Sequence, residues 1–149
     1  KSMIDNVLVN KLNKIHDDRG AIYHMLRCDN SHFEKFGEIY FSIAFPGIVK
    51  GWHEHTKQTQ NYAVIDGDIK LVLYDNRPES KTYKKIDEMI IGDKNYCLVT
   101  IPTGIATAYK NIGKKNSILA NCSTLPHDKN EMINYDFKGN KIPYNWDEN

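Results

Sequence analysis

The stretch that decides how this sequence is interpreted lies in the first half of the chain and reads Gly47-Ile48-Val49-Lys50-Gly51-Trp52-His53-Glu54-His55. We interpret it as an extended strand. In a strand, side chains two positions apart lie on one face, so the imidazoles of His53 and His55 point the same way. Trp52 and Glu54 then point the other way. Two histidines on one face beside Lys50 predict a polar pocket rather than an ordinary strand surface.

The sequence around this stretch is built from short extended segments. Beyond residue 35 no segment keeps the i, i+3, i+4, i+7 spacing of a helix for three turns. Short apolar runs recur instead, at spacings of roughly 8–12 residues, and they cover residues 38–45, 60–65, 68–74, 96–101, 105–110 and 117–122. The pair Asp66-Gly67 predicts a hairpin turn. At most one short helix is expected, over residues 30–36 with Ser31 as its cap.

These patterns predict one all-β domain over residues 1–149, a sandwich or a barrel, with an irregular segment from Pro126 onward. The charges nearly balance, with 20 Lys+Arg against 19 Asp+Glu, which argues against a nucleic-acid partner bound through bulk charge. No apolar run reaches the roughly 18 residues of a membrane span, and no apolar segment typical of a signal peptide follows the first residues. Three widely spaced cysteines argue against a disulfide framework, so we expect a cytoplasmic protein.

Two segments resemble the sequence motifs of the cupin superfamily. From Gly47 the chain is similar to the motif G-x5-H-x-H-x3-4-E-x6-G, with Gln60 in place of the glutamate and Gly67 at its end. Residues 102–111 are similar to the second motif, P-x-G-x2-H-x3-N, with Thr107 in place of the histidine. The resemblance implies a cupin-type double-stranded jelly roll with an interior pocket.

The two replacements bear on metal binding. Metal-dependent cupins hold their ion with the two histidines, the glutamate and the final histidine. An amide and a hydroxyl are poor ligands for a borderline divalent cation. We therefore expect no metal and no other cofactor, while a metal site made by His53, His55 and Gln60 stays open as a competing hypothesis.

A closer resemblance, to the dTDP-4-dehydrorhamnose 3,5-epimerase family, extends over most of the chain. That family carries D-x-R-G, G-V-L-R-G-L-H, a glycine hairpin, V-D-I-R and I-P-x-G-x-A-H in this order. The matching segments here are Asp17-Asp18-Arg19-Gly20, residues 47–53, Asp66-Gly67-Asp68, Tyr74-Asp75-Asn76-Arg77 and Ile101-Pro102-Thr103-Gly104. Residues 135–136 and 142–146 are similar to the late W-x-D and I-x-W segments of the family.

The resemblance implies an enzyme that epimerises or isomerises a 4-keto-hexose linked to a nucleoside diphosphate, for polysaccharide or deoxysugar biosynthesis. His53 matches the family's general base, and a neutral imidazole suits that task near pH 7. Lys50 matches an arginine that faces the nucleotide sugar, and its charge would stabilise an enolate. Asp75 is expected to hold the imidazole in the right tautomer. The family forms dimers, so we expect a homodimer in which Arg19 contacts the diphosphate, in its own pocket or its neighbour's.

The chain departs from the family at several positions. The family's general acid is a tyrosine in the strand before the proline matched by Pro126, and residues 119–124 contain none. Gln60 replaces a catalytic lysine, His24 replaces a glutamate, and the aspartate that orients the base has no counterpart. Replacement proton donors are sought among Tyr62, Tyr74 and Tyr109. The residues expected to contact the substrate are Arg19, His55, Gln60, Tyr62, Tyr74, Arg77 and Tyr109.

Several functions stay open on the sequence alone. A single epimerisation or a 3,4-keto-isomerisation needs fewer proton donors than a double epimerisation, and keto-isomerase relatives carry a paired H-x-H like His53 and His55. A metal-dependent cupin would instead use the two histidines as ligands. A binder of nucleotide sugars that has lost catalysis would account for the missing tyrosine and lysine.

Overall fold

The computed structural model describes residues 2–147 and shows strands joined by turns, with no helix in that range. The helix expected over residues 30–36 is absent: a bend and turn cover residues 30–32 and the rest is irregular, because a seven-residue segment is too short to hold a helix without tertiary support. The described part of the chain also contains no helix with the length and apolar character needed to cross a membrane. The strands are β1 Leu8–Lys11, β2 Lys14–Asp17, β3 Gly20–Tyr23, β4 Glu38–Ala44, β5 Val49–His55, β6 Gln60–Asp66, β7 Asp68–Asp75, β8 Ile86–Gly92, β9 Cys97–Ile101, β10 Ile105–Asn111, β11 Ser117–Ser123 and β12 Met132–Asn134.

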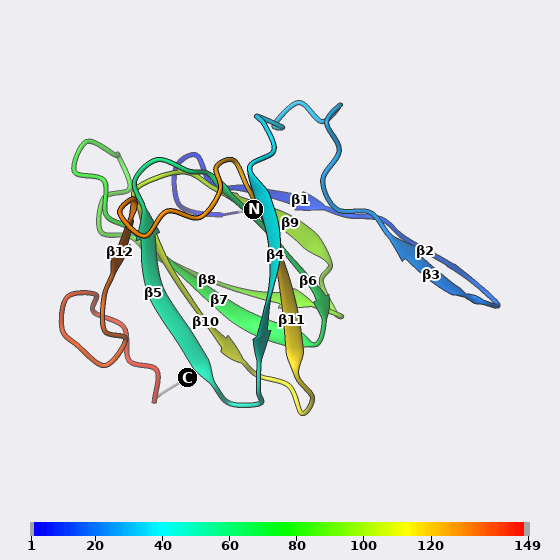
Figure 1. Ribbon diagram of the computed structural model, residues 1–149. Helices are drawn as coiled ribbons and strands as arrows, with labels where there is room; N and C mark the ends of the chain where they lie inside the picture. Colours follow the sequence, from blue (N-terminus) through cyan, green and yellow to red (C-terminus); the bar gives the residue numbers. More distant parts are fainter. Residues whose placement is uncertain (1, 148–149) are drawn as a thin grey trace.

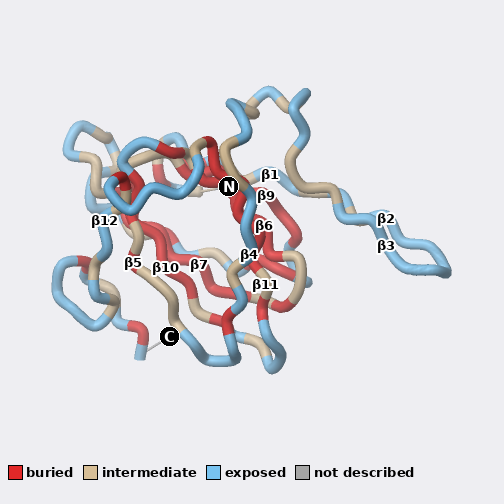
Figure 2. Tube along the Cα trace, viewed as in Figure 1, coloured by how far each residue is buried: buried red, intermediate tan, exposed pale blue. Residues whose placement is uncertain are grey.

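Two antiparallel five-stranded sheets face each other, which confirms the predicted all-β jelly roll (Figure 1). Their strand orders are β1-β9-β6-β11-β4 and β12-β5-β10-β7-β8. The apolar side chains between the sheets come from alternate positions, as with Leu71 and Leu73 of β7 opposite Val99 and Ile101 of β9. Figure 2 shows that the buried segments gather on the central strands of both sheets.

The Asp66-Gly67 turn does not close a hairpin. β6 belongs to the first sheet and β7 to the second, so the chain crosses between the sheets at this point. Gly67 has a φ of 83°, a left-handed conformation that favours glycine. The Asp66-Gly67 pair therefore predicted the left-handed residue correctly. The predicted hairpin is wrong, because this turn connects strands of two different sheets.

Strand β5 contains a β-bulge beside the predicted histidine pair. Thr107 of β10 lies opposite His53, and the next residue, Ala108, lies opposite Gly51, which leaves Trp52 without a partner on β10. Alternation alone would place Lys50 and His53 on opposite faces, because they are three positions apart. The extra residue at the bulge resets the alternation and brings both side chains to the inner face.

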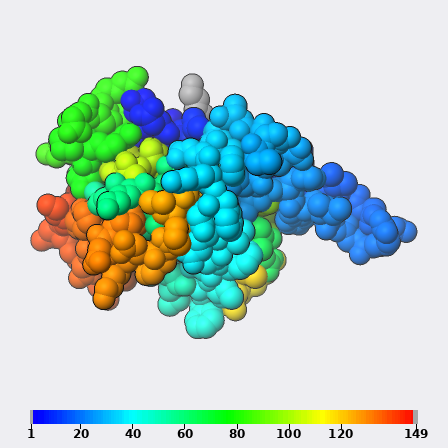
Figure 3. All heavy atoms as spheres, turned by 45° about the horizontal axis from the view of Figure 1, so that its top comes forward, coloured from blue at the N-terminus to red at the C-terminus, as the bar shows by residue number. Residues whose placement is uncertain are grey.

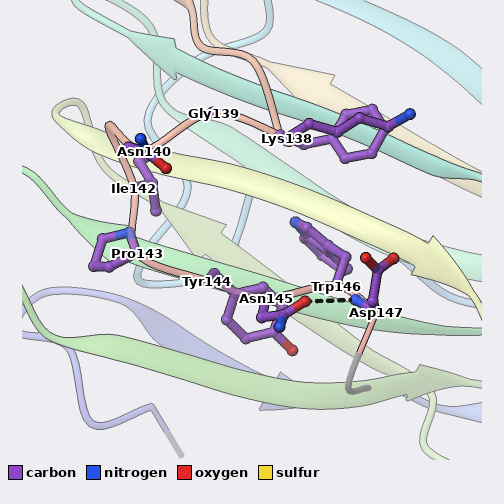
Figure 4. Close-up of a pocket in the computed structure, with 10 residues that line it drawn as sticks. Lys138, Gly139, Asn140, Ile142, Pro143, Tyr144, Asn145, Trp146 and Asp147 are labelled. Carbon is purple, nitrogen blue, oxygen red and sulfur yellow. Dashed lines mark hydrogen bonds between the residues drawn. The ribbon is translucent and has the colours of Figure 1, made fainter.

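The C-terminal segment covers the outer face of the second sheet, as the predicted irregular cap. Trp52 points outward from β5 and its ring centroid lies 5.8 Å from that of Trp146, while the rings of Tyr144 and Trp146 lie 4.7 Å apart. Figure 4 shows Tyr144 and Trp146 among the residues that line a hollow formed by this segment. The backbone groups of Trp52 and Tyr135 exchange two hydrogen bonds of 3.0 Å, which join the cap to β5.

Strands β2 and β3 form a two-stranded ribbon apart from both sheets. The ribbon extends away from the body of the molecule, at the right in Figures 1 and 3. Its side chains are mostly exposed, including the apolar Ile15 and Ile22. We call residues 14–23 the arm.

The bulge generates a prediction about Gly51. A Cβ at this position would lie 2.4 Å from the Cβ of Ala108, and the φ of 138° is unfavourable for other residues. We expect Gly51→Ala to lower the free energy of unfolding by about 2–4 kcal/mol. Urea unfolding measures this, with Gly113→Ala as the control, because its nearest atom would lie at 3.5 Å. Equal stability of the two variants would contradict the close approach of β5 and β10.

Candidate active site

A cavity of about 240 Å³ lies between the two sheets, beside the bulge. Four residues expected from the sequence share its wall: His53, Lys50, Tyr62 and Tyr109. The full lining consists of Tyr40, Ser42, Lys50, His53, Tyr62, Thr107, Ala108, Tyr109 and Leu119. Tyr40 and Ser42 of β4 were not predicted from the sequence, although their spacing of two along a predicted strand would have placed them on one face.

The imidazole of His53 is held in one orientation by the last described strand. Its Nδ1 lies 2.6 Å from Oδ1 of Asn134, which pairs with His53 across β12 and β5. Since the amide oxygen only accepts, Nδ1 carries the proton and donates it. In the neutral form of this imidazole Nε2 is then the unprotonated nitrogen, and it is the nitrogen that can accept a proton.

Lys50 provides a cation at the cavity wall. Its Nζ donates to Oγ of Ser42 at 3.1 Å and to the carbonyl of Ile43 at 2.6 Å. Ser42 Oγ in turn lies 2.7 Å from the hydroxyl of Tyr109. Within residues 2–147, no carboxylate lies within ion-pair distance of Lys50, so its charge is available to an anion in the cavity.

No hydrogen bond joins Asp75 to His53 among the described residues, so Asn134 and not Asp75 orients the imidazole. The buried Asp75 carboxylate accepts hydrogen bonds from Nε of Arg77 at 2.9 Å and from the hydroxyls of Ser80 and Thr82 at 2.6 Å each. Burial alone would raise the pKa of Asp75, but these hydrogen bonds outweigh it and lower the pKa to about 2. Both Asp75 and Arg77 therefore fasten the loop between β7 and β8 and lie outside the cavity lining.

His55 and Gln60 are buried beside the site without lining it. His55 Nδ1 forms a short hydrogen bond with Glu131, whose other carboxylate oxygen accepts the backbone N–H of Lys57 at 3.0 Å. Burial would raise the pKa of Glu131, but the hydrogen bond from His55 and those from the backbone lower it. Gln60 donates to Oε1 of Gln58 at 2.6 Å and accepts from the amide of Asn121.

Two further expected residues lie away from the cavity. Tyr74 points to the outer face of the second sheet, where it packs in the cluster with Trp52 and Trp146. Arg19 lies at the tip of the arm, with its side chain 85% exposed and its guanidinium 2.6 Å from the carboxylate of Asp17. In a single chain, therefore, Arg19 does not reach the pocket of its own jelly roll.

Of the three residues of the hypothetical metal site, His53, His55 and Gln60, only His53 lines the cavity. His55 and Gln60 bind the side chains just described, and Thr107 Oγ1 lies 3.4 Å from the hydroxyl of Tyr62. Among residues 2–147 no three His, Cys, Asp or Glu side chains are grouped so that they could hold a metal ion.

The fold and the cavity define a cupin-type protein with a basic imidazole and a cation facing an internal hollow. Comparison with known proteins narrows the class: the family model of dTDP-4-dehydrorhamnose 3,5-epimerase matches residues 1–149. This chain therefore belongs to the dTDP-4-dehydrorhamnose 3,5-epimerase family. It is 34% identical over 146 residues to the spore coat polysaccharide biosynthesis protein SpsL of Bacillus subtilis (strain 168), covering 97% of each chain.

Solved structures agree with this assignment. The structure of a dTDP sugar isomerase from Desulfovibrio desulfuricans G20 has a TM-score of 0.96 and 34% identity, with 99% of this chain and 94% of that chain covered. A dTDP-6-deoxy-D-glucose-3,5-epimerase from Legionella pneumophila Philadelphia 1, solved in complex with dTDP-4-keto-L-rhamnose, has a TM-score of 0.82. It is 20% identical, with 91% of this chain and 76% of that chain covered, and shows the same fold.

The surroundings of Asp75 generate a prediction about acid stability. Its pKa falls from 3.8 in the unfolded chain to about 2 in the folded protein, so its contribution is present above pH 3.8 and is lost as the pH falls toward 2. We expect Asp75→Asn to be less stable at pH 7 by on the order of 2 kcal/mol and to lose less stability over that acid window. Urea unfolding at several pH values measures this, with the exposed Asp18→Asn as the control. Parallel stability curves for Asp75→Asn and the parent protein would contradict the structural role.

Proposed function

We propose that this protein inverts a carbon next to the ketone of a 4-keto-hexose carried on a nucleoside diphosphate, with His53 as the general base. The observation that carries the proposal is the His53–Asn134 hydrogen bond, which makes Nε2 the proton-accepting nitrogen of a neutral, cavity-lining imidazole. Membership of the epimerase family supports the reaction class.

The chemistry follows from the acidity of a carbon beside a ketone. Such a C–H bond is weakly acidic, so a base succeeds only if the negative charge that develops on the ketone oxygen is stabilised. His53 would remove the proton, and the ammonium of Lys50 on the same strand face would stabilise the enolate oxygen.

The size of the cavity supports a sugar as the occupant. Its volume of about 240 Å³ lies below the roughly 300–1,000 Å³ of pockets that enclose drug-sized ligands. The cavity therefore suits one hexose ring, and the nucleoside diphosphate would extend out of it. The ligand of the Legionella protein, dTDP-4-keto-L-rhamnose, has this composition.

The similarity to SpsL supports a role in polysaccharide biosynthesis, and the three free thiols support a cytoplasmic location.

Solvent deuterium exchange tests the role of His53. Wild-type protein incubated with dTDP-4-keto-L-rhamnose in deuterated water should introduce deuterium at carbons next to the ketone. We expect His53→Asn to slow this exchange by about 100-fold or more, because no base remains. The exposed His127→Asn serves as the control and should exchange like the parent. Parent-like exchange by His53→Asn would show that His53 is not the base.

We further propose that the protein acts as a homodimer. Strand β4 is an edge strand, and its outward side chains Ile39, Phe41 and Ile43 are 47%, 58% and 50% exposed. An unpaired edge with an apolar face favours association with a second chain. The arm extends from the body and carries Arg19 at its tip, where it could reach the diphosphate in a partner's pocket (Figure 3).

Subunit complementation tests this arrangement. Arg19→Ala and His53→Asn should each lower epimerisation strongly when expressed alone. If Arg19 serves the partner's pocket, equal co-expression should restore about a quarter of wild-type activity, because each mixed dimer keeps one complete site. Mixed dimers without restored activity would show that Arg19 acts in its own chain or not at all. Sedimentation of Phe41→Asp as a monomer would confirm the β4 face as the interface.

A further inference from the structure

The two walls of the cavity come from different sheets. Lys50 and His53 lie on β5 of the second sheet, whereas Tyr40 and Ser42 lie on β4 of the first. A ring held between the sheets would therefore meet His53 on one side and Tyr40 on the other. Inversion of a carbon has the same requirement, since the proton leaves from one side and a proton arrives from the opposite side.

The hydrogen bonds around Tyr40 leave its own proton available. Asn121 lies opposite Tyr40 on the neighbouring strand, and its Nδ2 lies 2.9 Å from the Tyr40 hydroxyl. The orientation of this fully buried amide is fixed, because its Oδ1 accepts the backbone N–H of Asn61 at 3.2 Å and its Nδ2 also donates to Gln60. Asn121 is therefore the donor and the Tyr40 oxygen the acceptor, which leaves the Tyr40 O–H free to donate into the cavity.

The other two tyrosines of the cavity are placed differently. Thr107 donates its hydroxyl proton to the carbonyl of His53 at 3.4 Å, so Tyr62 can only donate its own proton to Thr107. Burial raises the pKa of Tyr62 well above its ordinary value, and burial also raises the pKa of Tyr109. The Tyr109 hydroxyl lies 2.7 Å from Ser42 Oγ, and the side chain is buried, so solvent does not directly replace a proton that it gives up. Tyr40 is 40% exposed, so a proton that it gives up can be replaced from solvent.

We infer that Tyr40 is the general acid of this enzyme, donating a proton to the sugar carbon from the side opposite His53. The inference rests on the proposed epimerisation. Strand β11, where the family carries its general-acid tyrosine, has no tyrosine in this chain, and Tyr40 on the neighbouring strand β4 would take over that role. Nε2 of His53 takes the proton from carbon, and the C–H electron pair forms the enolate. The enolate then takes the Tyr40 proton at the same carbon, the ketone re-forms, and a phenolate and an imidazolium remain.

The amide of Asn121 acts through Tyr40 in this scheme as a positioning residue. Its N–H already points at the phenolic oxygen, so the phenolate left after proton transfer keeps a hydrogen-bond donor. Protons then return to Tyr40 from solvent and leave His53 to solvent, and the step involves no oxidation or reduction.

The test separates proton removal from inversion. Tyr40→Phe keeps the ring and removes the donated proton, so His53 still exchanges the substrate proton with solvent from its own side. With dTDP-4-keto-L-rhamnose in deuterated water, we expect exchange within several-fold of wild type and formation of the inverted sugar slowed by about 100-fold or more. Tyr83→Phe is the matched control, since Tyr83 is 41% exposed and lies in the β7–β8 loop outside the cavity.

Four outcomes would overturn the assignment. Wild-type inversion by Tyr40→Phe would show that another group donates. Loss of inversion in Tyr62→Phe or Tyr109→Phe, with Tyr40→Phe unaffected, would name that group. Loss of both exchange and inversion in a folded Tyr40→Phe protein would make Tyr40 a binding residue. Absence of exchange in the wild-type protein would overturn the proposed function itself, a result distinct from the other three.

Discussion

The β-bulge at Gly51 and Trp52 is the constraint on which the site depends. Strand alternation would place Lys50 and His53 on opposite faces of β5. Trp52, which has no partner on β10, is the extra residue that brings both side chains to the inner face. The bulge also directs the Trp52 ring outward, where the C-terminal cap packs against it. β12, which directly precedes the aromatic residues of the cap, pairs with β5 and supplies Asn134. One local irregularity therefore places Lys50 and His53 and joins β5 to the segment that orients the His53 imidazole.

The distribution of charge around the cavity suits enolate chemistry. Of the residues that line it, Lys50 alone carries a permanent charge. Two buried carboxylates close to the second sheet have partners outside the cavity. Asp75 accepts hydrogen bonds from residues of the β7–β8 loop, and Glu131 binds His55. A carboxylate facing the cavity would repel the enolate oxygen, whereas the neutral amide of Asn134 fixes the tautomer of His53 without adding negative charge.

Sequence reasoning succeeded where the signal was local. The short apolar runs at 68–74 and 105–110 predicted β7 and β10. The segment around His53 predicted a pocket with Lys50 at its wall, and Tyr62 and Tyr109, two of the expected substrate contacts, line the same cavity. Sequence reasoning failed where tertiary pairing decides. Asp66-Gly67 signals a left-handed turn but not which sheet the next strand joins, and Asn134 is brought to His53 by a pairing of strands 81 positions apart. Tyr40 was not predicted, because the run over residues 38–45 carries large side chains on both faces and does not show that Ile39, Phe41 and Ile43 face outward.

The proposed mechanism requires a hexose ring between the sheets, with His53 on one side and Tyr40 on the other. A crystal structure with a nucleoside-diphosphate 4-keto-hexose bound measures this directly. We expect the ring in the cavity beside the bulge, with His53 Nε2 and the Tyr40 oxygen each about 3–3.5 Å from one sugar carbon, on opposite faces. A ring bound elsewhere, such as over the C-terminal aromatic cap, or both groups on the same face of the ring, would contradict it.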